Sequence, residues 1–275
     1  MADLYAVVGN PIKHSKSPAI HGQFAQQTQE AVDYTKLLAP LDNFSGFVRD
    51  FFAQGGKGLN VTVPFKEQAW ELSQRLSPAA QLAGAVNTLY LNDAGELCGD
   101  NTDGVGMVRD IIVNQGCEIA GKRVLILGAG GAVRGVLQPV IAQAPAAITI
   151  ANRTASKAEA LADLVHELMP VSACGYPDLE GQTFDVVING TSASLGGSLP
   201  SLPANLLAPN AWVYDMMYGA EPTIFMAWAA DHGADKTIDG LGMLVEQAAE
   251  SFNIWRGVRP DSAPVLASLR QELTV

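Results

Sequence analysis

The sequence predicts an α/β protein of two domains with mainly parallel sheets. Short apolar runs, typical of strands buried on both faces, alternate along the chain with amphipathic stretches that predict helices. The chain has 275 residues, which is long enough for two modest cores. Its 48% hydrophobic and 16% charged residues are ordinary for a globular protein.

The composition excludes several classes of function. A formal net charge of -11 argues against broad binding to nucleic acids or anionic membranes, because both depend on an excess of Lys and Arg. The three Cys lack metal-ligand spacing and are odd in number, so we expect neither a metal site nor a disulfide framework. Since there is no signal-peptide pattern and no apolar run of membrane-spanning length, we expect a cytoplasmic protein.

The first expected strand covers residues 4–8, and a polar loop follows it. Ser17, followed by Pro18, is expected to be the N-cap of a helix that continues to about Gln29. Because the amides of that helix point back at the loop, Ser15 and Ser17 could present hydroxyls to a carboxylate. The alternative is that Ser17 serves only as the cap.

Further alternation places polar residues at one edge of the first sheet. We expect a strand, a helix and a second strand at residues 32–38, 44–54 and 59–63. Pro64 ends the second strand and Lys66 begins the next helix, so Asn60, Thr62 and Lys66 lie near the edge where open α/β sheets bind ligands. Lys66 could be a surface cation, but a helix N-terminus is an unfavourable place for one.

Asn87 lies in the next expected strand, and a run rich in acids and hydrogen-bonding side chains follows at residues 99–104. Asp100 and Thr102 in this run could bind a ligand or could cap the helix expected at about 104–114. That helix leads into the second domain.

The clearest motif of the chain lies at residues 123–136, where a buried strand, a glycine turn and a helix toward Ala144 follow one another. Gly128 and Gly130 fit the first two positions of the G-x-G-x-x-G fingerprint, whereas Val133 occupies the third. Glycines and free helix amides let a pyrophosphate approach closely. The motif therefore predicts a nucleotide-binding turn, with a plain tight turn as the alternative.

The end of the following strand, residues 147–151, indicates which cofactor binds. An NAD-binding unit has an acid there for the ribose 2'-hydroxyl, whereas this chain has Asn152 and Arg153. Arg153 and Lys157, with Thr154 as the expected helix cap, offer charge suited to a 2'-phosphate. We therefore expect NADP rather than NAD, unless these cations are only a solvated helix start.

The remaining elements continue the alternation. Thr191 follows a buried strand and is expected at the cofactor edge, while Met216 could be core filler or a nicotinamide contact. A serine, glycine and proline loop is expected at residues 194–203. We expect helices at about 156–169 and 221–232, one continuing to about 255, and one after 260, with strands at 184–188 and 212–218.

Seven motifs, in this order, resemble those of bacterial shikimate dehydrogenases. They lie at residues 9–18, 60–66, 84–88, 99–104, 128–132, 152–154 and 239–243, so the resemblance spans nearly the whole chain. It implies NADPH-dependent reduction of 3-dehydroshikimate to shikimate. It also implies a substrate domain made of residues 1–103 and 240–275, an inserted Rossmann-type dinucleotide-binding domain at 104–239, and an active site in the cleft between them.

The resemblance assigns a role to each matching residue. Lys66 and Asp103 match the catalytic pair. This fits the chemistry, because an ammonium held by a carboxylate can stabilise negative charge on a ketone oxygen and deliver a proton. The sequence does not decide which of the two is the formal acid. The substrate-binding positions are Ser15, Ser17 and Thr62 for the carboxylate, Asn60, Asn87 and Gln247 for ring hydroxyls, and Tyr218. The glycine turn, the cations after the second strand and the resemblance together give the expected cofactor-binding positions, which are Gly128, Ala129, Gly130, Gly131, Ala132, Asn152, Arg153, Thr154, Lys157, Thr191, Met216 and Gly240.

Two alternatives remain open at this stage. One is a quinate/shikimate dehydrogenase, against which Arg153 and Ser15 argue. The other is a dinucleotide-sensing binding module, which would need neither Lys66 nor Asp103. The sequence leaves open whether the protein is a monomer or a homodimer.

Overall fold

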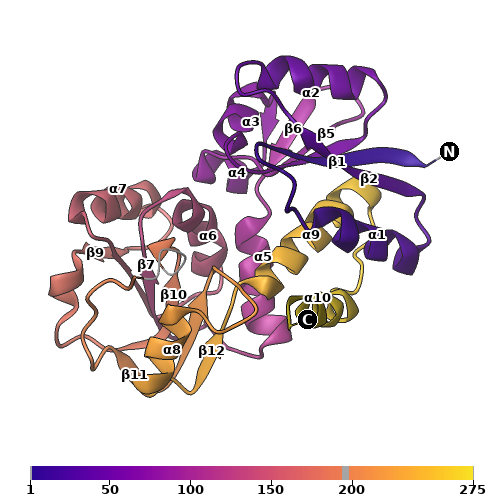
Figure 1. The fold of residues 1–275 in the computed structure, drawn as a ribbon. Coiled ribbons are helices and arrows are strands. Elements are labelled where there is room, and N and C mark those ends of the chain that lie inside the picture. The colour runs from indigo at the N-terminus through magenta and orange to yellow at the C-terminus, as the bar shows by residue number, and fades with distance from the viewer. Residues whose placement is uncertain (1, 194–197, 275) are drawn as a thin grey trace. The chain divides into compact units, whose positions relative to one another are not determined.

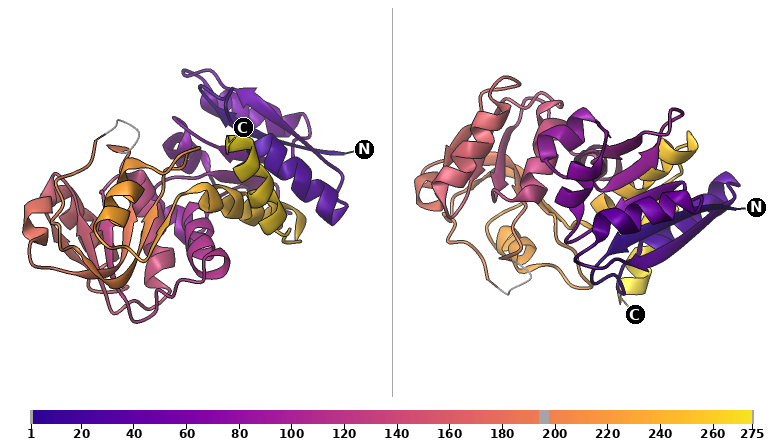
Figure 2. Two further views of the ribbon diagram at one scale, coloured as in Figure 1. Left: turned by 60° about the horizontal axis from the view of Figure 1, so that its bottom comes forward. Right: turned by 90° about the horizontal axis from the view of Figure 1, so that it is seen from above.

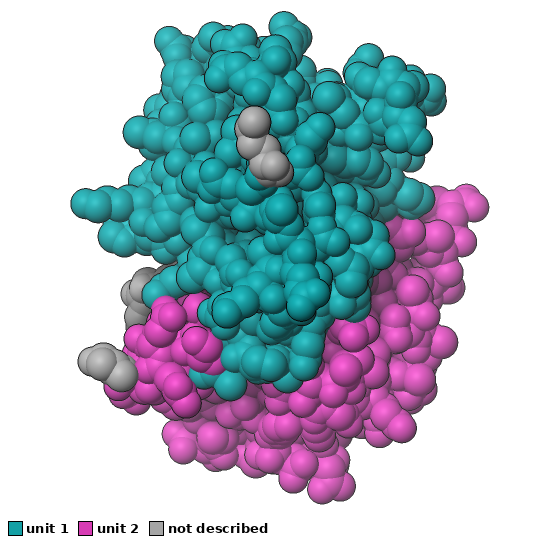
Figure 3. All heavy atoms as spheres, turned by 90° about the vertical axis from the view of Figure 1, so that its right-hand side faces the viewer, with its two compact units in different colours: residues 1–106, 245–267 teal, residues 107–244, 268–275 magenta. Residues whose placement is uncertain are grey.

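The computed structural model describes residues 2–193 and 198–274 (Figures 1 and 2). The chain divides into two compact units (Figure 3). Unit 1 consists of Met1–Gly106 and Val245–Ala267, and unit 2 of Met107–Leu244 and Ser268–Val275. Each unit contains one six-stranded sheet, and neighbouring strands are mostly parallel, as the sequence predicts for an α/β protein.

Unit 1 is built on a mixed sheet with the strand order β2-β1-β3-β5-β6-β4. Strand β5 is antiparallel to both neighbours, whereas the other neighbouring pairs are parallel. It follows that β1, β3 and β6 end at the edge where β5 begins. The strands are β1 (Asp3–Gly9), β2 (Val32–Leu38), β3 (Gly58–Val61), β4 (Arg75–Leu76), β5 (Thr88–Leu91) and β6 (Leu97–Asp100).

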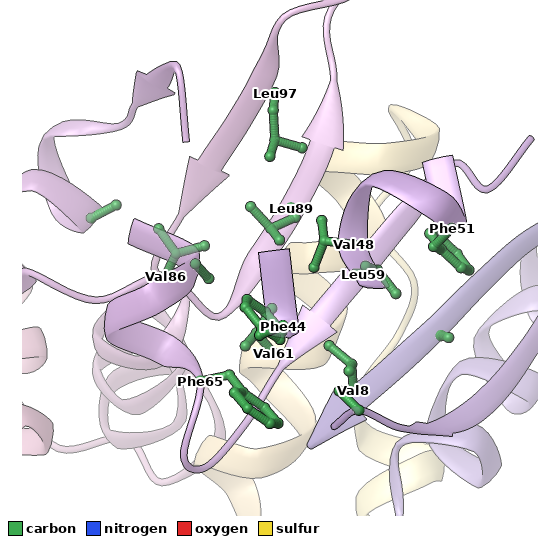
Figure 4. Close-up of a cluster of buried hydrophobic side chains, with 14 residues drawn as sticks. Val8, Phe44, Val48, Phe51, Leu59, Val61, Phe65, Val86, Leu89 and Leu97 are labelled. Carbon is green, nitrogen blue, oxygen red and sulfur yellow. The ribbon is translucent and has the colours of Figure 1, made fainter. Parts of the chain in front are cut away.

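One face of this sheet packs against helix α2 (Phe44–Ala53). The side chain of Asn43 caps the helix by accepting a hydrogen bond from the Gly46 N–H, and the buried residues Phe44, Val48 and Phe51 recur at helical spacing. Figure 4 shows them clustered with strand residues such as Leu59 and Val61, and with Phe65 near Phe44. The two rings stack with 4.5 Å between centroids. Truncating either ring to Ala should cost about 3 to 5 kcal/mol.

The opposite face of the sheet packs against α1 (Ser17–Thr28) and α9 (Leu241–Arg256). Here the ring centroids of Tyr5 of β1 and Trp255 of α9 are 4.8 Å apart, and the ring of Tyr34 of β2 stacks on that of His21 of α1. Because side chains alternate along a strand, Asn60 lies on this face while its neighbours in β3 contribute to the other. The remaining helices of unit 1 are α3 (Lys66–Leu72), α4 (Pro78–Ala83) and the start of α5 (Asp103–Arg109).

Unit 2 contains a fully parallel sheet in the order β12-β11-β10-β7-β8-β9. Counted within the unit, this is the 3-2-1-4-5-6 order of the doubly wound dinucleotide-binding fold, whose switch point lies between β7 and β10. The strands are β7 (Arg123–Leu127), β8 (Ala147–Ala151), β9 (Ser172–Cys174), β10 (Phe184–Asn189), β11 (Leu207–Asp215) and β12 (Lys236–Ile238). The helices are α6 (Gly131–Ile141), α7 (Ala155–Val165) and α8 (Ile224–Asp231), with a π-helix at Asp110–Asn114 and a 3-10 helix at Tyr176–Leu179. Helix α10 (Ala263–Thr274) begins in unit 1 and ends in unit 2.

Several expected boundaries were wrong. Strand β11 ends at Asp215, so Met216 and Tyr218 follow the strand. Asn87 lies one residue before β5. Helix α7 ends at Val165, four residues before the expected end, and α8 starts at Ile224 because the Thr223 side chain caps it. Residues 194–197 of the expected loop lie outside the described residues.

No helix within residues 2–193 and 198–274 is long and apolar enough to cross a membrane. All three cysteines lie within these ranges, and each is a free thiol.

Candidate active site

Lys66 and Asp103 form an ion pair at the ligand edge of the unit 1 sheet. Each residue begins a helix, and these helices follow β3 and β6, which end at the same edge. The distance from Lys66 Nζ to Asp103 Oδ2 is 2.6 Å, and the side chains are 30% and 19% exposed. The carboxylate offsets the unfavourable cation at the start of α3, and the ammonium keeps access to a ligand. This pair can stabilise a developing oxyanion and give it a proton.

The second oxygen of Asp103 is held by Asn87. Nδ2 of Asn87 donates to Asp103 Oδ1 at 2.8 Å and to the Thr102 hydroxyl at 2.9 Å. Its Oδ1 accepts from the Thr102 N–H at 3.0 Å and from the Thr88 hydroxyl at 2.8 Å. Because Asn87 is buried and used at both ends, the orientation of the Asp103 carboxylate is fixed.

Asn60 lies beside this group and is also buried. Its Nδ2 donates to the Ser251 hydroxyl at 2.9 Å and to the Asn87 carbonyl at 3.2 Å, while its Oδ1 accepts from the Tyr34 hydroxyl at 2.7 Å. Gln247 reaches the same cluster, since its Oε1 accepts from Asn87 Nδ2 at 3.3 Å. The structure therefore brings together the residues expected to hold ring hydroxyls.

Tyr34, Thr88 and Ser251 belong to this cluster, and sequence reasoning missed all three. Ser251 lies one helical turn after Gln247, so the i, i+4 spacing on α9 is a signal that could have identified it. Tyr34 has no comparable local signal, because its contact with Asn60 depends on how β2, β1 and β3 align.

The serine loop corrects one expectation. Helix α1 begins at Ser17 itself, and Lys16 occupies the N-cap position with no side-chain cap bond to the described residues. The Ser15 hydroxyl accepts from the Ser17 N–H at 3.3 Å, and the two hydroxyl oxygens are 3.2 Å apart. Ser17 is therefore not the cap. Thr62 lies beside Gly9, the last residue of β1, because a Cβ at Gly9 would come within 2.5 Å of the Thr62 methyl group.

The glycine turn of unit 2 lies at the switch point between β7 and β10. Gly128 has φ +108°, and a Cβ there would come within 3.0 Å of Thr191, so a tight turn accounts for this glycine. It does not account for Gly130 and Gly131. A Cβ on either would meet nothing within 4 Å among the described residues, and no described side chain caps α6. The open space beside free helix amides fits a pyrophosphate.

The end of β8 presents exposed cations. Arg153 and Lys157 are exposed, and Asn152 shapes the turn between them by donating to the Thr154 carbonyl at 2.9 Å. Thr154 is the N-cap residue of α7 as expected, although its side chain makes no cap bond within the described structure. These donors fit a 2'-phosphate on an adenosine ribose.

Met216 and Gly240 meet elsewhere in unit 2. A Cβ at Gly240 would come within 2.2 Å of the Met216 carbonyl oxygen, so only glycine permits this approach. Met216 is buried against Gly190, whereas Tyr218, two residues further on, is 36% exposed. Arg270 holds this turn through two bonds to Asp239, at 2.7 and 2.5 Å.

Three family models match successive parts of the chain. The shikimate dehydrogenase substrate binding domain matches residues 7–89, the shikimate / quinate 5-dehydrogenase model matches 111–196, and the shikimate 5'-dehydrogenase C-terminal domain matches 240–270. Together these matches cover both units.

Curated and solved relatives are similar over nearly the full chain. Shikimate dehydrogenase (NADP(+)) of Alkalilimnicola ehrlichii is 61% identical over 272 residues, covering 99% of this chain and 100% of that protein. The structure of an Ael1 enzyme from Pseudomonas putida has a TM-score of 0.92 and 46% identity, covering 100% and 99% of the two chains. Shikimate 5-dehydrogenase of Thermus thermophilus, solved with NADP(H) and shikimate, has a TM-score of 0.86 and 30% identity, covering 98% and 100%. The chain therefore belongs to the shikimate dehydrogenase family.

Proposed function

We propose that this protein is an NADP-dependent shikimate dehydrogenase, which interconverts 3-dehydroshikimate and shikimate. Family membership supports the activity, and the observation that carries the proposal for this chain is the Lys66–Asp103 ion pair, with Asn87 holding the carboxylate. A binding module would have no need of a proton donor fixed at a ligand edge.

In the proposed reaction, reduction of the ketone places negative charge on the carbonyl oxygen. The nicotinamide of NADPH, when bound, supplies the hydride. Lys66 stabilises the oxygen and delivers its proton, and Asp103 keeps the ammonium in place. In the oxidation of shikimate the same pair takes up the hydroxyl proton.

Substrate binding is proposed for the ligand edge of unit 1. Ser15, Ser17 and Thr62 receive the carboxylate, and Asn60, Asn87 and Gln247 hold ring hydroxyls. The match to the family also supports Tyr218 as a proposed substrate contact. The paired serine hydroxyls and the cluster around Asn87 support this division, because carboxylates and alcohols both need fixed hydrogen-bonding partners.

Cofactor binding is proposed for the switch point of unit 2. Residues 128–132 cradle the pyrophosphate, and residues 152–154 with Lys157 bind the adenosine 2'-phosphate through Arg153. Thr191, Met216 and Gly240 are proposed on the nicotinamide side. Because all three cysteines are free thiols, we further propose that the enzyme works in the reducing cytoplasm.

The experiment follows the absorbance of the reduced cofactor with shikimate or quinate, each with NADP+ or NAD+. We expect efficient turnover for shikimate with NADP+ only. Comparable turnover of quinate would favour a quinate/shikimate dehydrogenase. Binding of NADP+ without turnover of either alcohol would favour the binding module and refute the proposal.

A further inference from the structure

We propose that Tyr34 is a positioning residue: its hydroxyl fixes the orientation of the Asn60 amide, so that Asn60 offers an acceptor oxygen to a substrate hydroxyl. This inference rests on the proposed function, because it assigns a binding polarity to one residue of the proposed substrate site.

The hydrogen-bond partners of Asn60 show which end of its side-chain amide is the NH2 group, because some of these partners can only accept a hydrogen. One end of its amide faces the Asn87 backbone carbonyl at 3.2 Å, and a carbonyl has no hydrogen to donate. The same end faces the Ser251 hydroxyl at 2.9 Å, whose oxygen lies 3.1 Å from another carbonyl, that of Gln247. Ser251 gives its own hydrogen to that carbonyl or to Thr88, so it accepts from Asn60. The NH2 end of Asn60 therefore faces Asn87 and Ser251.

The opposite end of the amide, the oxygen, faces Tyr34. The Tyr34 hydroxyl lies 2.7 Å from Asn60 Oδ1, and burial raises the Tyr34 pKa well above 10, so the hydroxyl is protonated and donates. The Tyr34 oxygen in turn interacts with the Ser17 hydroxyl. The phenol thus links the proposed carboxylate side of the site to the proposed hydroxyl side.

The position of the Tyr34 ring is held by His21. The two rings stack with 4.1 Å between centroids and 6° between planes, and His21 is completely buried among aromatic side chains. Burial lowers the pKa of His21 to about 3, so its ring is neutral and adds no charge beside Asn60.

The consequence is a defined polarity toward substrate. Both amide hydrogens of Asn60 have protein acceptors, so its NH2 end has no hydrogen left for a substrate. Oδ1 accepts from Tyr34 and also faces the His21 ring, whose nitrogens make no hydrogen bond to the described residues. Asn60 therefore accepts a hydrogen from a substrate hydroxyl. Without the Tyr34 hydroxyl, Oδ1 loses its donor and the amide is held only at its NH2 end, so the oxygen is less firmly directed toward the substrate.

The test compares Tyr34→Phe with Tyr90→Phe. Both changes remove one phenol hydroxyl from the unit 1 sheet. Tyr90 lies opposite Gly58, and its hydroxyl interacts with Cys98 and not with Asn60 among the described residues. Tyr34→Phe keeps the ring that stacks on His21. We expect its KM for shikimate to rise about two- to twelvefold, the range of one hydrogen bond, with kcat within about twofold of wild type and KM for NADP+ unchanged. Tyr90→Phe should leave all three constants near wild type.

An unchanged shikimate KM in Tyr34→Phe, or an equal rise in both variants, would overturn the inference. If Tyr34→Phe fails to fold, Ser251→Ala decides, because it frees the other end of the Asn60 amide and should raise the same KM. Its matched control is Ser73→Ala, since both serines bond the carbonyl four residues earlier. An unchanged KM in Ser251→Ala would then overturn the inference. Failure of the proposed function would differ, because wild-type protein would not oxidise shikimate.

Discussion

The two ligand edges of this molecule are built in opposite ways, although both lie where β-strands end. At the edge of unit 1, buried amides and hydroxyls already bind one another around Asn60, Asn87 and Asp103. At the edge of unit 2, Gly130 and Gly131 border open space, and the nearby cations are exposed. The first edge is arranged before ligand arrives, whereas the second leaves room for a group that brings its own charge.

The difference has a physical reason. A buried polar group without a partner costs about 1 to 3 kcal/mol, so side chains that orient a substrate must be satisfied by one another. Exposed cations such as Arg153 and Lys157 keep their hydration and need no partner until a phosphate binds. We therefore expect changes at the ligand edge of unit 1 to affect chemistry and substrate binding, and changes at the glycine turn and the exposed cations of unit 2 to affect cofactor binding.

The largest effect should come from Lys66→Ala. If Lys66 acts on the carbonyl oxygen only as charge develops, its loss should lower kcat at least about 100-fold with little change in KM. Asp103→Asn should lose a comparable amount, and the double variant should be little worse than either, because the pair acts as a unit. Circular dichroism checks folding. A wild-type kcat in Lys66→Ala would contradict the catalytic role and mean that Lys66 is only a surface cation.

Cofactor choice should respond to Arg153. We expect wild-type kcat/KM for NADP+ to exceed that for NAD+ at least about tenfold, because a hydrogen bond to a charged group contributes about 1.5 to 3 kcal/mol. Arg153→Asp should lower the ratio of kcat/KM for NADP+ to kcat/KM for NAD+, or bring it below one. Arg49→Asp, at an exposed arginine of unit 1, makes the same charge change and should leave the ratio alone. Equal loss in both variants would mean that net charge, not Arg153, governs cofactor choice.

Substrate binding should respond to Ser15. Ser15→Ala should raise KM for shikimate about two- to twelvefold, as expected for one hydrogen bond, while KM for NADP+ stays nearly fixed. The exposed Ser45 of α2 supplies the control, Ser45→Ala. If shikimate KM is unchanged in Ser15→Ala, this serine only supports the start of α1 through the Ser17 N–H.

The smallest effect concerns stability. Burial lowers the pKa of His21 to about 3. Between pH 6.5 and about 3, His21 is therefore protonated in the unfolded chain and neutral in the folded chain. Stability is therefore lost as pH falls through this window, by about 0.7 kcal/mol from pH 7 to pH 6 for this group. Urea unfolding at both pH values should show that loss in wild type and not in His21→Phe. Identical pH dependence in the two proteins would contradict a neutral, buried His21.

Local pattern was enough to predict the longer apolar strands and the motifs that follow them, whereas the short strands β4, β6, β9 and β12 were not predicted. The apolar runs ending at Val61 and Leu127 placed Lys66 and Gly128 at ligand edges, because parallel strands end together. The contacts around Asn60 could not be predicted this way. Ser251 lies 191 residues from Asn60, and their hydrogen bond depends on the packing of α9 on the sheet. The failed Ser17 cap has a similar cause, because the loop turns so that Lys16 precedes the helix.

The most direct test of the division between the two edges is the dissociation constant of NADP+ for Lys66→Ala, measured by calorimetry on the folded variant. Because Lys66 belongs to unit 1 and the proposed cofactor residues around Gly130 and Arg153 belong to unit 2, we predict a value within about twofold of wild type, while kcat falls at least about 100-fold. A tenfold or greater weakening of NADP+ binding would contradict the account, since Lys66 would then serve the cofactor and not the substrate oxygen.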